Sequence, residues 1–132
     1  MITKKMKIKI ASVLFSLFLI QTLLSCNKDD EPKISSKKIV FKAEASSGVL
    51  VNMVVYGFDT DLTTISSANV QTWTSQEITL PANYNVATIT ANAMGTNATS
   101  TLKVKIFIDG VEKKVSTSTG TALSATAQYN LK

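Results

Sequence analysis

Residues 102–111 read LKVKIFIDGV, the clearest structural signal in the chain. The apolar residues at the even positions of 102–108 alternate with Lys103, Lys105 and Phe107, as expected of a β-strand. Asp109 and Gly110 follow, and both residue types tolerate the positive φ angles of a two-residue hairpin turn. The stretch therefore predicts a strand over 102–108 that turns back into a second strand over 111–117.

The same period of two continues on both sides of this hairpin and predicts an all-β domain over residues 38–132. Turn residues separate the apolar runs at intervals of about 8 to 12 residues. Further strands are expected at 39–45, 49–56, 70–73, 77–80, 86–93 and 123–131, with a polar loop at 59–69. Seven or eight short strands of this kind predict an antiparallel, immunoglobulin-like β-sandwich.

The run over 49–56 is apolar on both faces, which favours a central position in its sheet. Regular alternation would place Val49, Val51, Met53 and Val55 together on one face. Gly57 follows and is expected to mark a bulge or the end of the strand.

Composition argues against an enzyme. The 132 residues include no His and a single Cys, so a Ser-His pair and an internal disulfide are both excluded. His is also the commonest metal ligand among side chains. The few carboxylates of the domain lie mostly at expected turns or on solvent-facing positions. We therefore expect a non-enzymatic protein without a cofactor or a bound metal.

The first 25 residues have the organisation of a secretory signal peptide. Four lysines precede position 10, and the apolar stretch over 10–24 is about 22 Å long as a helix, short of a bilayer core of about 30 Å. Leu23-Leu24-Ser25-Cys26 resembles the lipobox of bacterial lipoproteins. The resemblance implies cleavage after Ser25 and a lipid on the Cys26 thiol, which would anchor the protein in a membrane. An ordinary signal peptide and an uncleaved anchor are the alternatives.

Residues 26–37 form a polar tether between Cys26 and the expected domain. Lys28, Asp29, Asp30 and Glu31 follow the Cys directly and look like the signal that sends lipoproteins of the Bacteroidota to the outer face of the outer membrane. The motif predicts an outer-membrane lipoprotein that faces the cell exterior. Anchoring toward the periplasm and a merely solvated linker are the alternatives.

The basic charge of the chain belongs mainly to the signal peptide. The net charge is +5, and removal of the four leading lysines leaves ten lysines against nine acids. No basic stripe survives that would indicate nucleic-acid binding. Lys103, Lys105, Lys113 and Lys114 flank the hairpin and are expected to be a solvated strand face that protects a sheet edge.

Two further groups are candidate sites in the domain. Trp73, Tyr56 and Tyr84 are the candidate ligand-binding residues, as an aromatic platform for sugar, although such residues in a β-sandwich more often pack against the core. Asp59 and Asp61 offer oxygen ligands for Ca²⁺, but a metal site is not expected because nothing nearby completes the shell and turn-forming carboxylates explain the pattern.

A family resemblance covers most of the domain. Five stretches carry the resemblance: Val40-Phe41 to Gly48, the apolar strand over 51–56, Leu80-Pro81, Ile106-Phe107-Ile108-Asp109-Gly110-Val111, and Ser118-Thr119-Gly120-Thr121-Ala122. Together they resemble the soluble domain of the mycobacterial membrane protein small family. The resemblance implies a membrane-anchored β-sandwich that assists a large lipid or siderophore exporter. The chain departs from that family in lacking its Cys pair and its transmembrane anchor.

The expected function is therefore that of a lipid-anchored accessory or assembly module of the cell envelope, with an envelope protein as a possible partner. The alternative is a surface module that binds carbohydrate or a host ligand.

Overall fold

A computed structural model describes residues 36–80 and 82–132 of the chain. The predicted signal peptide, the predicted lipidation site Cys26 and the predicted sorting residues 28–31 lie outside the described residues. The strands of the described part are β1 (Lys38–Ala45), β2 (Val51–Phe58), β3 (Asp61–Ile65), β4 (Thr72–Thr74), β5 (Ile78–Thr79), β6 (Val86–Met94), β7 (Thr101–Ile108), β8 (Val111–Thr119) and β9 (Ala122–Asn130). Within this part, no helix is long and apolar enough to cross a membrane.

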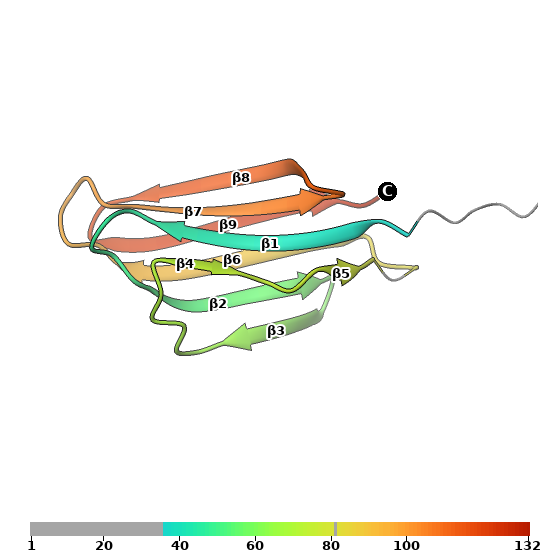
Figure 1. Cartoon of the computed structure of the whole chain (residues 1–132), viewed down its shortest axis with the longest axis horizontal. Coiled ribbons are helices and arrows are strands. Elements are labelled where there is room, and N and C mark those ends of the chain that lie inside the picture. The colour runs from blue at the N-terminus through green and yellow to red at the C-terminus, as the bar shows by residue number, and fades with distance from the viewer. Residues whose placement is uncertain (1–35, 81) are drawn as a thin grey trace, which may run out of the picture. The chain divides into compact units, whose positions relative to one another are not determined.

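The strands form two antiparallel sheets that pack as a sandwich (Figure 1). One sheet has the order β4-β1-β7-β8, with β5 also paired to β1, and the other has the order β3-β2-β6-β9. The predicted antiparallel β-sandwich is confirmed. The described part contains nine strands rather than seven or eight.

Strand β3 accounts for part of this difference, because the sequence predicts a polar loop over residues 59–69. β3 pairs with β2 from Ile65 opposite Val54 to Asp61 opposite Phe58. It is an edge strand, and four of its five residues are exposed. Since neither face is buried, the strand needs no apolar alternation, and backbone pairing with β2 holds it in place.

The core lies between the sheets and consists of alternate residues of each long strand. β1, β6 and β7 show the predicted alternation most clearly. The alanines of β6 and β9 leave room between the sheets for the larger side chains of β1 and β7. The buried residues of these four strands include Ile39, Phe41, Ala43, Ala87, Ile89, Ala91, Leu102, Val104, Ile106, Ala125 and Ala127.

Strand β2 corrects the predicted alternation over 49–56. Val51 pairs with Ala93 while Met53 pairs with Asn92, so Asn52 is an extra residue in a β-bulge. The bulge shifts the period, and Val51 and Val54 are both fully buried. As expected, β2 is an inner strand, between β3 and β6.

Gly57 is the penultimate residue of β2, next to the expected strand end, and the bulge of this strand lies at Asn52 instead. It pairs with Leu62 on one side and Thr88 on the other. Its φ is 152°, and a Cβ atom at this position would lie 2.1 Å from the carbonyl oxygen of Asp61. The close approach of β3 therefore explains the glycine.

The predicted hairpin at 109–110 is confirmed. β7 pairs with β8, and both turn residues have positive φ, 51° at Asp109 and 78° at Gly110. This turn, the start of β1 and the C-terminus lie at one end of the sandwich, here called the Lys38 end (Figure 1). The loops at residues 46–50 and 95–100 lie at the opposite end.

Candidate functional site

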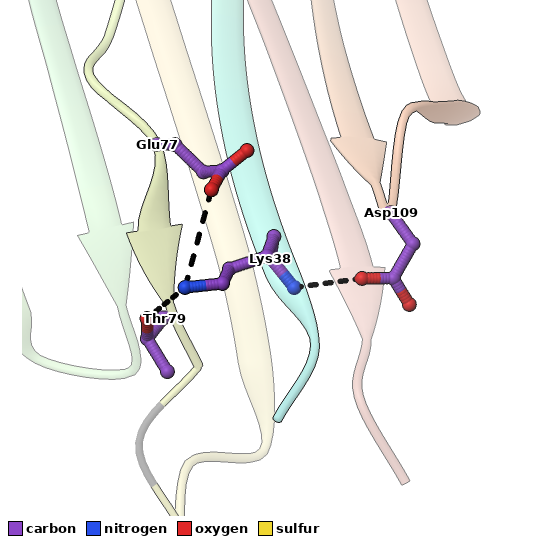
Figure 2. Close-up of polar contacts among 4 residues, drawn as sticks. All are labelled: Lys38, Glu77, Thr79 and Asp109. Atoms are coloured by element: carbon purple, nitrogen blue, oxygen red, sulfur yellow. Dashed lines mark hydrogen bonds and ion pairs between the residues drawn. The ribbon is translucent and has the colours of Figure 1, made fainter. Parts of the chain in front are cut away.

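Lys38 is the first residue of β1 and follows the predicted tether in sequence; Figure 2 shows its polar contacts. Its backbone N–H donates a hydrogen bond to Oδ1 of Asp109 at 2.9 Å. Its Nζ donates to Oγ1 of Thr79 at 2.8 Å and lies 3.9 Å from the Glu77 carboxylate. The first residue of β1 is thus attached to β5 on one side and to the β7–β8 turn on the other.

Two of the three predicted aromatic residues form a contact between the two sheets. Trp73 of β4 packs on Tyr56 of β2, with ring centroids 4.9 Å apart. Tyr56 continues to Phe41 at 5.4 Å, and Phe41 to Phe58 at 5.9 Å. All these rings are fully or partly buried against the core, so packing between the sheets already uses part of their surface.

Tyr84 joins the same row of rings at its other end, 5.3 Å from Phe58. The structure therefore brings Trp73 and Tyr56 into direct contact and connects Tyr84 to them through two phenylalanines. A ligand-binding role for Trp73, Tyr56 and Tyr84 stays a prediction.

Asp59 and Asp61 have structural partners. The Asp59 carboxylate accepts hydrogen bonds from the backbone N–H groups of Asn85, at 3.2 Å, and Val86, at 2.9 Å. The Tyr84 hydroxyl donates to the Asp61 carboxylate, and this bond, followed by burial and the negative charge of Asp61, raises the pKa of the tyrosine. Both carboxylates therefore have structural roles, because they bond to groups in the turn and at the end of a strand. Among the described residues, no group of three or more His, Cys, Asp or Glu side chains is placed to hold a metal ion.

The outer face of the five-stranded sheet carries a small network of charges. The Glu44 carboxylate lies 2.8 Å from Nζ of Lys42 and 3.1 Å from Nζ of Lys105. Hydrogen bonds from these two ammonium groups lower the pKa of Glu44, and the bond to Glu44 raises the pKa of Lys105. Lys105 also lies 3.6 Å from Glu112. These ion pairs partly neutralise the lysine-rich face expected on β7.

A groove of about 660 Å³ lies between the edge strands β8 and β9. β8 contributes Lys113 and Lys114, and β9 contributes Thr126, Gln128, Tyr129 and Asn130. The groove offers two ammonium groups, a hydroxyl, two amides and a phenol, which suit recognition by charge and hydrogen bonds. The two lysines are candidate residues from the sequence, but the β9 residues are not. The polar residues of β9 alternate as they do on the solvent-facing side of any strand, so their pattern gives no sign of a site.

In comparisons with known proteins, no family model and no curated protein matches this chain.

Proposed function

We propose that the protein is a lipid-anchored, non-enzymatic module of the bacterial cell envelope, held in the outer membrane by Cys26 and facing the cell exterior. The observation that carries this proposal is the lipobox at residues 23–26, followed by a charged tether that leads directly into a β-sandwich.

The lipid anchor gives stable membrane attachment because a lipoprotein carries two or more acyl chains. Each buried methylene contributes about 0.8 kcal/mol, and a single chain gives only reversible binding. A twelve-residue polar tether, residues 26–37, then separates the lipid from the folded domain. Within this arrangement the domain binds or assembles with other envelope components rather than catalysing a reaction.

We assign an accessory role beside an envelope transporter, for which the support is the resemblance to the mycobacterial membrane protein small family. A second observation favours a protein partner at the end opposite Lys38. Leu50 and Met94 are 50% and 67% exposed there. The antiparallel pairing of Val51 with Ala93 places these two apolar residues on neighbouring strand ends. Apolar side chains exposed together often mark interaction sites.

Replacement of Cys26 tests the anchor. Cys26→Ala should abolish lipidation and processing after Ser25, so that the longer precursor accumulates and incorporates no labelled fatty acid. Ser36→Ala, beyond the predicted lipobox, is the control and should leave both properties unchanged. Incorporation of labelled fatty acid into Cys26→Ala would contradict the proposed anchor.

Photo-crosslinking in intact envelopes tests the accessory role. A photoreactive residue at Leu50 should capture an envelope protein. The same residue at Leu62, 48% exposed on β3, should not. Equal capture from both positions, or capture from neither, would contradict a protein partner at this end.

A further inference from the structure

The groove between β8 and β9 has a feature that ordinary strand geometry does not provide. Lys113 and Lys114 are consecutive residues of β8, and consecutive side chains of a regular strand point to opposite faces. Both nevertheless line the same groove. The pairing of β8 with β7 gives the reason.

Lys113 is the extra residue of a second β-bulge. Phe107 pairs with Glu112 and Ile106 pairs with Lys114, so Lys113 has no partner on β7. A bulge bends its strand and re-aims the side chains beside it, and such bulges occur often next to functional sites. Here the bulge accounts for two neighbouring positive charges in one groove.

The charges of these lysines are not balanced by the acid nearest in sequence. Glu112 lies 3.6 Å from Lys105 and forms its ion pair there. None of the four ion pairs found among residues 36–80 and 82–132 includes Lys113 or Lys114. The two ammonium groups can therefore contact a bound anion.

The opposite wall of the groove is a row of hydrogen-bonding side chains. Thr126, Gln128 and Asn130 alternate along β9 and cover about 14 Å at about 3.4 Å per residue. Their hydroxyl and amide groups both donate and accept hydrogen bonds, as the hydroxyls of a sugar do. Tyr129 adds an aromatic ring with a polar tip.

The geometry points to this groove as a binding site for an acidic oligosaccharide, a chain of sugars that carries carboxylates. The carboxylates contact Lys113 and Lys114, and the sugar hydroxyls contact the β9 row. A volume of about 660 Å³ is within the usual range of about 300 to 1,000 Å³ for ligand sites.

An extended acidic peptide fits this site less well. Such a peptide binds a sheet edge by adding a strand, which needs a regular row of free backbone groups. The bulge at Lys113 interrupts that row on β8, and lysines on an edge strand oppose strand addition. Side-chain recognition therefore fits the groove better than backbone pairing.

Binding of defined probes to the full-length chain, purified in detergent, tests the inference. Tetragalacturonate should bind, and a neutral galactose tetrasaccharide should bind at least about tenfold more weakly, because hydrogen bonds to charged groups are the stronger ones. Lys113→Gln and Lys114→Gln should each weaken tetragalacturonate binding about tenfold. Lys103→Gln, on the neighbouring strand β7 and outside the groove, is the matched control and should leave the affinity unchanged.

Backbone amide NMR shifts give a second readout that does not depend on affinity alone. Tetragalacturonate should shift the signals of Thr126, Gln128 and Asn130 and leave those around Trp73 unchanged. The inference would be overturned if the neutral tetrasaccharide bound as tightly as tetragalacturonate, or if Lys103→Gln weakened tetragalacturonate binding as much as Lys113→Gln does. It would also be overturned if an acidic peptide, tetraglutamate, bound through these lysines and tetragalacturonate did not bind. None of these results depends on the lipid anchor, so they are separable from the tests of Cys26.

Discussion

Lys38 and Asp109 exchange two hydrogen bonds at one end of the five-stranded sheet. The Lys38 N–H donates to Oδ1 of Asp109 at 2.9 Å, and the Asp109 N–H donates to the Lys38 carbonyl at 2.8 Å. The pair joins the first strand to the β7–β8 turn, directly beside the predicted tether. The two hydrogen bonds therefore fix the start of β1 against this turn.

Removal of the Asp109 side chain should weaken this link. Asp109→Ala should lower the free energy of unfolding by about 1 to 2 kcal/mol. The variant loses the hydrogen bond to the Lys38 N–H, and it places alanine, which rarely adopts positive φ, at a φ of 51°. Asp109→Asn keeps the acceptor and tolerates this φ, so it should cost less than about 0.5 kcal/mol. Urea unfolding measures both values, and equal costs would contradict the assigned role.

Gly57 should be far less replaceable than Gly48. Both have positive φ, 152° and 79°, but a Cβ atom at Gly57 would collide with the Asp61 carbonyl, while one at Gly48 meets nothing within 4 Å. Gly57→Ala should therefore destabilise the domain by about 2 kcal/mol more than Gly48→Ala. Thermal unfolding followed by circular dichroism compares the two variants, and similar melting temperatures would refute the steric argument.

Glu44 should contribute to stability in a pH-dependent way. Hydrogen bonds from Lys42 and Lys105 lower its pKa in the folded state below the ordinary value of 4.5. Its contribution is therefore present above about pH 4.5 and is lost as the pH falls through the lowered pKa. The network is partly exposed, so the contribution should stay below about 1 kcal/mol. Urea unfolding of wild type and Glu44→Gln should differ at pH 7 and converge near pH 2. A constant difference would contradict the prediction.

The charged residues after Cys26 should direct the protein to the cell surface. Replacement of Lys28, Asp29, Asp30 and Glu31 by Ala should leave lipidation and folding intact, because neither depends on these side chains. It should move the domain from the cell exterior to the periplasmic side. Protease treatment of intact cells should then digest the wild type and spare the variant.

Two outcomes would contradict this prediction in different ways. Protection of both proteins would exclude surface exposure of the wild type. Digestion of both would exclude a sorting role for the four residues. Ser35→Ala, a change in the tether outside the charged motif, is the control and should behave as the wild type.

The strands with one fully buried face are predictable from the sequence. β1, β6 and β7 alternate strictly because burial of one face demands an apolar residue at every second position. The turn at Asp109 and Gly110 is equally predictable, since few residue types accept two successive positive φ angles. β3 escapes prediction because it is exposed and depends on its neighbour β2.

The sequence by itself determined the fold class, the hairpin and most strand positions, because local backbone preferences and the period of burial are written along the chain. Only the tertiary structure decided the two bulges, at Asn52 and Lys113, because a bulge exists only relative to the partner strand. It also decided the groove, whose walls come from strands in different sheets. The alternation within β8 does not show which side chains of β9 lie across the groove, because the packing of the two sheets decides that.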